Sequence, residues 1–221
     1  MRPFQFRLTH LALMVVVAAG VSAFLTAAGR ARTAARASQC GNNPFRLHLG
    51  LRNYRDATGR NPPAVQLDAG GRSMHSWRAI LCASQFPDAF AVPYDFGLPW
   101  DHPANLKAAV VAPNDMVCLN TQAAPARHAN VAAVVDGDLC SLDLTGRVGP
   151  GGPWIVLVEV ADPKIFWTEP RDVTPAEIAA FAAPHDPGGF AVAFSDGSSG
   201  RLSREEILAN WAGARAVLGS V

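Results

Sequence analysis

The fold is decided by the first apolar stretch, residues 8–28, which reads LTHLALMVVVAAGVSAFLTAA. It contains no Asp, Glu, Lys or Arg. As an α-helix its 21 residues would measure roughly 30 Å, the thickness of the hydrocarbon core of a bilayer. A surface helix of a soluble domain would carry a polar face, which this stretch lacks. We therefore predict a membrane anchor. The anchor residues are Leu8, Leu11, Leu13, Val15, Val16, Val17, Val21, Phe24 and Leu25.

A second interpretation of this stretch is a signal peptide that is removed. Two arginines precede it, and Val21-Ser22-Ala23 or Thr26-Ala27-Ala28 offers a small-residue cleavage site. The following residues favour retention, because they are rich in Ala, Arg and Leu and contain no proline before Pro44. This composition is typical of a helix that leaves the membrane and continues. We therefore favour the retained anchor over the cleaved peptide.

The charges of the chain are unevenly distributed, although the formal net charge is only +1. Residues 1–60 contain nine arginines and one acid, Asp56, for a net charge of +8. The remaining residues carry ten basic and 17 acidic side chains, for a net charge of −7. A basic stalk below an acidic head fits a protein that stands on an anionic leaflet. Nucleic acid is not an expected partner, because aromatic residues do not alternate with these arginines.

The length of the chain allows one domain besides the anchor. We predict a membrane anchor at 1–29, a stalk helix at 30–57 and a globular head domain at 58–221. The stalk would end at Ala57-Thr58-Gly59, because glycine commonly ends a helix. Helical patterns dominate the first half of the chain and strand patterns the second, so the predicted class is α+β.

Local patterns predict further elements of the head. Ser73 is a candidate N-cap of a helix that extends to about Ser84, and a short helix is expected at 104–108. The strand candidates are residues 116–119, 131–135 and 154–160.

Three signals near the C-terminus are more specific. Thr174 with Glu177, and Ser203 with Glu206, have the spacing of capping boxes and each predict the start of a helix. Between them, apolar residues alternate before Asp196-Gly197, which predicts a β-hairpin with its turn at this dipeptide.

The four cysteines, Cys40, Cys82, Cys118 and Cys140, have no CxxC spacing, so a zinc site is not expected. In an oxidising compartment they can form one or two disulfides, with three pairings if all four join. Alternatively, they are small buried side chains. The sequence leaves both interpretations open.

Short motifs extend from the anchor to about Ser203. They are Ser38-Gln39-Cys40-Gly41-Asn42-Asn43, Leu49-Gly50-Leu51-Arg52-Asn53-Tyr54, Pro62-Pro63, Ser76-Trp77-Arg78, Pro99-Trp100-Asp101, Glu159-Val160-Ala161-Asp162, Trp167-Thr168-Glu169-Pro170-Arg171-Asp172, and His185 with Gly188-Gly189-Phe190 and Asp196-Gly197. They resemble a large bacterial family of pseudopilin-like proteins, catalogued as domain of unknown function 1559. The resemblance implies a pilin-like fold, in which the long N-terminal transmembrane and stalk helix packs on a small antiparallel sheet with short helices.

The resemblance assigns structural roles to individual motif residues. These are Cys40, Asn43, Trp77, Glu159, Glu169, Pro170, Arg171, Asp172, His185, Gly188, Gly189, Phe190, Asp196 and Gly197.

The sequence departs from this family in two places. Members usually begin with a prepilin peptidase site followed by a glutamate five places into the helix, whereas this chain has Gln5-Phe6-Arg7-Leu8-Thr9-His10. In pilins that glutamate pairs with a neighbouring amino terminus during assembly. The second departure is Asp186, an apparent insertion that leaves ten residues instead of nine between His185 and Asp196.

Three groups of residues suggest chemistry. His185 with Asp196 could form an acid–base pair, although a turn role for both is the simpler interpretation. Glutamates and aspartates could bind Ca²⁺, but they lack the spacing of a calcium loop. They are Glu159, Asp162, Glu169 and Asp172. Tryptophans could line a glycan or peptide groove, or be core residues. They are Trp77, Trp100, Trp154 and Trp167.

Hydrolase and nucleotide-binding motifs such as GxSxG, HExxH and the P-loop are absent from the sequence. We therefore expect no catalysis, cofactor or metal. The resemblance implies a pilin-like or pseudopilin-like envelope protein, single-pass in the inner membrane with its head outside the cytoplasm. The arginines on both sides of the apolar stretch do not decide the orientation. The expected partners are membrane lipid and other pilin-like subunits or secretion-system components. The alternative is an anchored module that does not polymerise and binds an extracellular glycan or peptide. A hydrolase that uses His185 with Asp196 is the least favoured hypothesis.

Overall fold

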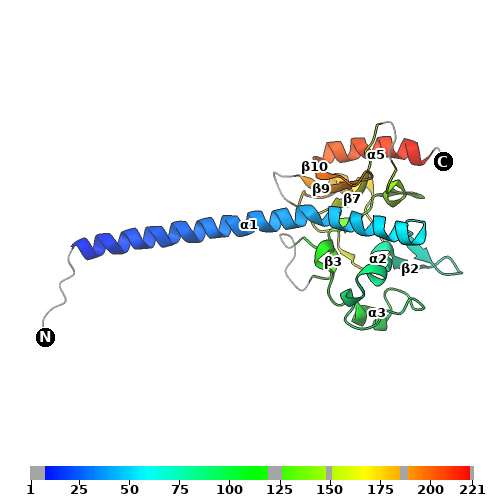
Figure 1. Cartoon of the computed structure of the whole chain (residues 1–221), viewed down its shortest axis with the longest axis horizontal. Coiled ribbons are helices and arrows are strands. Elements are labelled where there is room, and N and C mark those ends of the chain that lie inside the picture. Colours follow the sequence, from blue (N-terminus) through cyan, green and yellow to red (C-terminus); the bar gives the residue numbers. More distant parts are fainter. Residues whose placement is uncertain (1–7, 119–125, 148–150, 185–188, 220–221) are drawn as a thin grey trace. The chain divides into compact units, whose positions relative to one another are not determined.

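The computed structural model describes residues 8–118, 126–147, 151–184 and 189–219 (Figure 1). The chain forms two compact units, Met1–Ser38 and Gln39–Val221. One long helix, α1 (Leu8–Thr58), makes up the described part of the first unit and opens the second. Short helices and small antiparallel sheets follow. The predicted α+β class is therefore confirmed.

The first unit exposes the apolar stretch that opens the sequence. Leu13 is 62% exposed and Phe24 72%, and the other large apolar side chains of residues 11–25 are similarly open. Within the described residues, α1 is the one helix long and apolar enough to cross a membrane, although a signal sequence would have the same properties. The side chain of Leu8 lies outside the described part of the chain.

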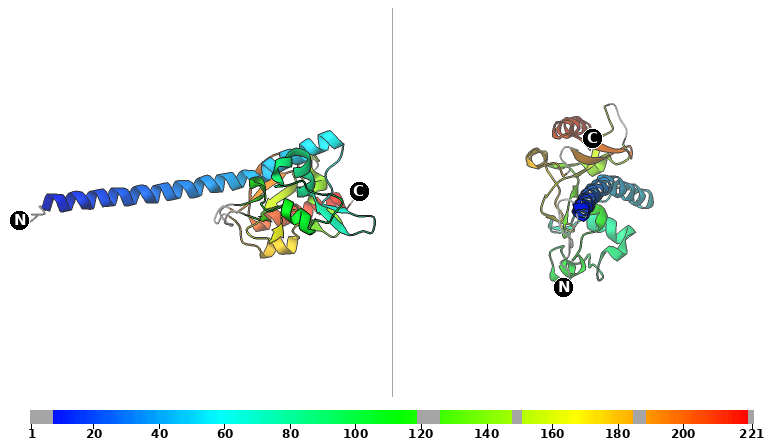
Figure 2. Two further views of the ribbon diagram at one scale, coloured as in Figure 1. Left: turned by 90° about the horizontal axis from the view of Figure 1, so that it is seen from below. Right: turned by 90° about the vertical axis from the view of Figure 1, so that its left-hand side faces the viewer.

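The second unit is built around a four-stranded antiparallel sheet in the order β10-β9-β7-β4. Its strands are β4 (Val131–Ala132), β7 (Ile155–Glu159), β9 (Phe190–Phe194) and β10 (Ser199–Leu202). Every residue of β7 is buried, so both faces of the sheet need cover. Helix α5 (Arg204–Leu218) lies on one face, and residues 39–58 of α1 lie on the other (Figures 1 and 2).

Smaller elements surround this sheet. They are β1 (Val65–Leu67), β2 (Ser73–Ser76), α2 (Trp77–Gln85), η1 (Pro87–Ala89), α3 (Pro103–Ala108), η2 (Asn114–Met116), β3 (His128–Ala129), β5 (Val135–Asp136), β6 (Leu139–Cys140), η3 (Ser141–Leu144), β8 (Ile165–Phe166) and α4 (Pro175–Ala180). The remaining strands form three two-stranded antiparallel sheets, which pair β1 with β2, β3 with β8, and β5 with β6.

The strongest local signals in the sequence are confirmed. Both capping boxes are present, with Thr174 and Glu177 opening α4 and Ser203 and Glu206 opening α5. Strands β9 and β10 form the expected hairpin. In each case the partners are at most a few residues apart, so the local sequence specifies the structure.

The expected N-cap at Ser73 is wrong. Residues Ser73–Ser76 form β2, which pairs with β1 across a turn in which Asp68 accepts backbone hydrogen bonds. Helix α2 begins at Trp77, and the hydroxyl of Ser76 accepts a hydrogen bond from the Ala79 N–H at 3.2 Å. Pairing with β1 thus moved the helix start by three residues.

Two strand predictions also need correction. Residues 114–116 form the 3₁₀ helix η2, and the N–H of Cys118 donates to the side-chain oxygen of Asn130 at 2.8 Å. The predicted strand at 131–135 is divided into β4 and β5, because the N–H of Ala133 donates to Asp172 at 2.9 Å. At both places a backbone N–H donates to a buried polar side chain instead of to a neighbouring strand.

Gly189 gives a stability prediction for the β9–β10 hairpin. Its φ is +71°, and a Cβ there would lie 2.6 Å from the carbonyl oxygen of Leu202. Gly59 has a similar φ of +76° with open space around it. We expect Gly189→Ala to lower the free energy of unfolding by about 2–3 kcal/mol and Gly59→Ala by about 1 kcal/mol. Urea unfolding followed by tryptophan fluorescence measures both. Equal losses would show that the Leu202 contact has no energetic weight.

Candidate functional site

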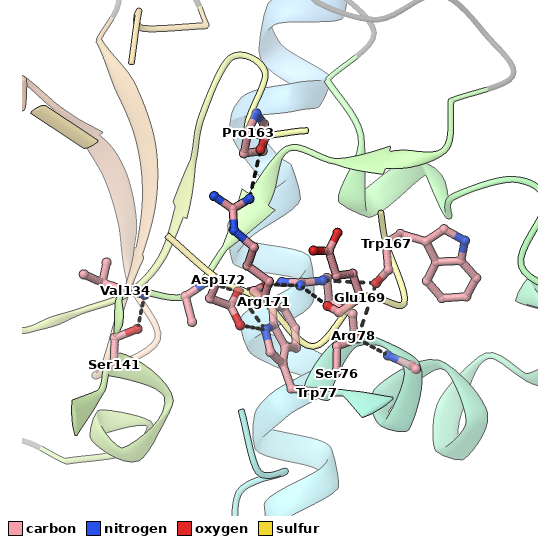
Figure 3. A network of polar contacts seen from close by, with 12 residues as sticks. Ser76, Trp77, Arg78, Val134, Ser141, Pro163, Trp167, Glu169, Arg171 and Asp172 are labelled. Atoms are coloured by element: carbon pink, nitrogen blue, oxygen red, sulfur yellow. Dashed lines mark hydrogen bonds and ion pairs between the residues drawn. The ribbon is translucent and has the colours of Figure 1, made fainter. Parts of the chain in front are cut away.

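A buried ion pair lies at the centre of the family-motif residues (Figure 3). The guanidinium of Arg78 and the carboxylate of Asp172 are 2.6 Å apart, and their side chains are 0% and 1% exposed. Burying two charges costs several kcal/mol per ion unless geometry and hydrogen bonding compensate. Several hydrogen bonds to each group provide this compensation.

Arg78 donates hydrogen bonds to backbone carbonyl groups of a segment about ninety residues away in the chain. Its guanidinium donates to the carbonyl oxygens of Trp167 at 3.1 Å, Glu169 at 3.0 Å and Arg171. The segment 167–172 can therefore be buried without forming a strand or a helix. Two motifs that resembled the family in sequence, Ser76-Trp77-Arg78 and residues 167–172, thus form one structural unit.

Asp172 accepts hydrogen bonds from α2 and from the residue that follows β4. The indole N–H of Trp77 lies 3.2 Å and 3.1 Å from its two oxygens, and the backbone N–H of Ala133 donates at 2.9 Å. Sequence reasoning singled out Trp77 and Asp172 but missed Arg78 as a site residue. The signal available was its position beside Trp77 in a family motif, yet an arginine in an amphipathic helix is ordinarily exposed.

The neighbouring motif residues hold the outer side of this segment. The carboxylate of Glu169 accepts a hydrogen bond from the Phe166 N–H at 3.0 Å. Arg171 pairs with Glu177 of α4 and donates to the carbonyl of Pro163 at 3.2 Å. Pro170, Arg171 and Asp172 thereby form one wall of a groove.

This acidic groove has a volume of about 720 Å³. Its walls come from residues 63–65, the β5–β6 hairpin and the segment that carries Asp172 and Glu177. Asp172 and Glu177 have arginine partners, whereas Asp138 and Asp143 take part in no ion pair within the described residues. The groove therefore presents negative charge to solvent and suits a cationic group.

The tryptophans do not form a binding surface. Trp77, Trp154 and Trp167 are at most 4% exposed, which confirms the core interpretation for these three, and Trp100 is half-buried. A smaller hollow of about 470 Å³ is instead lined by Phe90, Tyr94 and Phe96. Burial raises the pKa of the Tyr94 hydroxyl.

Asp196 has the turn role that was the simpler interpretation. Its carboxylate accepts hydrogen bonds from the hydroxyl of Ser198 at 2.6 Å and the Ser198 N–H at 2.9 Å, which lower its pKa. Gly197 follows with a φ of +93°. His185 and Gly188 lie outside the described residues, so their predicted roles stay predictions.

The suggested calcium cluster does not assemble. Asp172 pairs with Arg78, Glu169 caps a backbone N–H, Asp162 is exposed, and Glu159 is buried in β7. The described residues bring together a different group of three potential metal ligands. It comprises Cys40, Cys118 and Glu159, all buried.

All four cysteines are buried. Burial raises the pKa of Cys82 to about 12 and also raises that of Cys140. Other family-motif residues have packing roles. Asn43 donates to the carbonyl of Val117 at 2.8 Å, and Phe190 is buried in β9.

The Arg78–Asp172 pair gives a prediction for the head. Arg78→Met leaves Asp172 charged and buried, so we expect the free energy of unfolding to fall by about 3–5 kcal/mol. The matched control is Arg215→Met, which removes an exposed ion pair with Asp136 and should cost less than about 1 kcal/mol. Urea unfolding of the full chain in detergent compares them. Similar losses in the two variants would contradict a central role for the buried pair.

His48 of α1 gives a prediction for pH dependence. Burial, with a smaller contribution from Arg52, lowers its pKa from 6.5 to about 4, although Asp196 opposes this shift. The unfolded chain therefore binds more protons between these values, and stability falls as the pH drops from about 6.5 to 4. We expect this fall to be smaller by up to about 3 kcal/mol in His48→Leu.

Urea unfolding at pH 7, 5.5 and 4 measures this difference. His75, whose pKa burial also lowers, contributes equally to both proteins. Parallel stability curves for wild type and His48→Leu would show that His48 is not protonated on unfolding.

Comparisons with known proteins agree with the resemblance seen in the sequence. The model of a family described as a protein of unknown function, DUF1559, matches residues 29–139, which is half of the chain. No curated protein and no solved structure matches the chain. The chain therefore belongs to the DUF1559 family of proteins of unknown function.

Proposed function

We propose that this chain is a pilin-like envelope protein, anchored by one span in the inner membrane, whose head lies outside the cytoplasm. Its role is structural or protein-binding, without catalysis. The observation that carries this proposal is the exposed apolar surface of residues 11–25 of α1. In water such a surface would be strongly unfavourable, whereas in a bilayer each apolar side chain is in its preferred solvent.

The second part of α1 supports a structural role. After the apolar stretch, Cys40, Asn43, Leu47 and Leu51 repeat every three or four residues and are buried in the head. The helix that would hold the protein in the membrane therefore also contributes to the core of the head. The proposed partners are membrane lipid and other pilin-like subunits or secretion-system components, which would contact the head or the apolar helix.

The alternative is an anchored binding module that does not assemble. Two observations favour it: the absence of the prepilin peptidase site and the acidic groove beside Asp138 and Asp143. Since the groove is negatively charged and Trp77, Trp154 and Trp167 are buried, a basic peptide is a better candidate ligand than a neutral glycan.

Membrane extraction tests the anchor. We expect the wild-type chain to remain in the pellet after a carbonate wash. Val16→Arg combined with Val17→Arg should release it, because each arginine near the middle of a span costs about 2.5–3.5 kcal/mol. Val111→Arg, at a 46%-exposed position of the head, is the control and should stay in the pellet. Wild-type protein in the wash would overturn the anchored interpretation.

Three further measurements on protein from the same membranes separate the alternatives. Amino-terminal sequencing that starts at Met1 supports a retained anchor, and a start near residues 24–29 indicates a cleaved signal peptide. Crosslinking into ladders supports assembly. A monomer that is retained by immobilised basic peptides, and released when Asp138 and Asp143 are both changed to Asn, supports the binding module.

A further inference from the structure

The described residues bring two cysteine sulfurs together deep in the head. Cys40 lies on α1, Cys118 lies two residues beyond η2, and Glu159 is the last residue of β7. The two sulfurs and a carboxylate oxygen lie within 4.8 Å of one another, and the three residues are at most 1% exposed. Cys82 and Cys140 are not part of this group.

Hydrogen bonds next to each cysteine hold the two sulfurs near each other. Asn43, one turn after Cys40 on α1, donates to the carbonyl oxygens of Val117 at 2.8 Å and Asn114 at 3.2 Å. The N–H of Cys118 itself donates to the buried side chain of Asn130 at 2.8 Å. The backbone on which Cys118 sits is therefore attached directly to the turn of α1 that carries Cys40.

We propose that Cys40 and Cys118 form a disulfide that joins α1 covalently to the head. A change of rotamer moves a cysteine sulfur by about 3 Å, enough to bring two sulfurs at this distance into bonding range. The inference rests on the proposed location of the head outside the cytoplasm, because disulfides persist in oxidising compartments.

The bond forms by two thiol–disulfide exchanges with an oxidant of the disulfide class, such as glutathione disulfide or an envelope dithiol oxidase. One cysteine thiolate attacks the disulfide of the oxidant, forms a mixed disulfide and expels one oxidant thiolate. The second cysteine thiolate attacks the mixed disulfide and expels the other oxidant thiolate. The two cysteines lose two protons to solvent and two electrons to the oxidant. Because both side chains are buried in the folded head, this exchange takes place during folding.

A metal ion fits this group less well. Structural zinc sites are almost always four-coordinate, and the described residues supply three ligands. Two thiolates beside a carboxylate would also leave one uncompensated negative charge around Zn²⁺ in a buried site. A disulfide requires neither a fourth ligand nor a buried thiolate.

Peptide mapping tests the pairing directly, because trypsin places each cysteine in a separate peptide. Cys40 falls in residues 37–46, Cys82 in 79–107, Cys118 in 108–127 and Cys140 in 128–147. The full chain is extracted from membranes in detergent, with N-ethylmaleimide present from lysis, and digested without reductant. We expect one linked species, 37–46 with 108–127, and alkylated peptides for Cys82 and Cys140.

Three results in the same sample would contradict a disulfide formed in the cell. They are alkylation of both Cys40 and Cys118, linkage of either to Cys82 or Cys140, and one equivalent of zinc bound to the purified chain. A second sample is unfolded, reduced and refolded in detergent with a glutathione redox buffer. If only this sample is linked, the pairing stands and the proposed location of the head fails.

Thermal unfolding with and without reductant provides a second readout. Crosslinks between residues far apart in sequence stabilise most, so we expect reduction to lower the Tm of the wild type by about 5–15 °C. Cys118→Ala should have a Tm that does not respond to reductant, whereas Cys140→Ala should respond as the wild type does. A reductant-sensitive Tm in Cys118→Ala would overturn the assignment.

Discussion

The head depends on one buried ion pair, between Arg78 and Asp172. Placing both charges away from water is unfavourable by itself, and it is tolerated because each group makes several hydrogen bonds besides the ion pair. Arg78 donates to three carbonyl groups of residues 167–171, so this segment needs no partner strand. Asp172 accepts from Trp77 and Ala133, and thereby links α2, the sheet and this segment. The acidic groove exists because this irregular segment is held in place and forms its wall.

Helix α1 has two parts that differ in composition and exposure. Residues 11–25 are apolar on all sides and exposed, whereas from Cys40 onward one side of the helix is buried. That buried side includes polar groups, such as Asn43, which supplies hydrogen bonds to the segment before Cys118. His48 is also buried there, and neither ring nitrogen has a hydrogen-bond partner among the described residues. The second part of α1 is therefore specialised for one environment, the interior of the head.

The family-motif residues in the described part of the chain contribute mainly to packing and hydrogen bonding. Asn43, Trp77 and Asp172 fix segments to one another, and Asp196 with Gly197 closes the β9–β10 turn. Their placement supports a role for the motif in building the head, while the acidic groove offers surface for recognition. This division agrees with the proposed structural or protein-binding role of the head.

Elements whose causes are local can be predicted from the sequence. The apolar helix, the two capping boxes and the Asp196-Gly197 turn are specified by residues that are close in the chain, so spacing alone predicts them. The start of α2 could not be placed this way, because pairing of β1 with Ser73–Ser76 overrides the nearest capping residue.

The contacts between groups that are distant in the chain become visible only in the folded head. The pairing of Arg78 with Asp172 and the gathering of Cys40, Cys118 and Glu159 join residues from elements far apart in the chain. Such contacts depend on how helices and strands pack, and no periodicity or spacing in the sequence records that packing. Burial then gives the ion pair its energetic weight, since charges removed from water must find partners inside the protein.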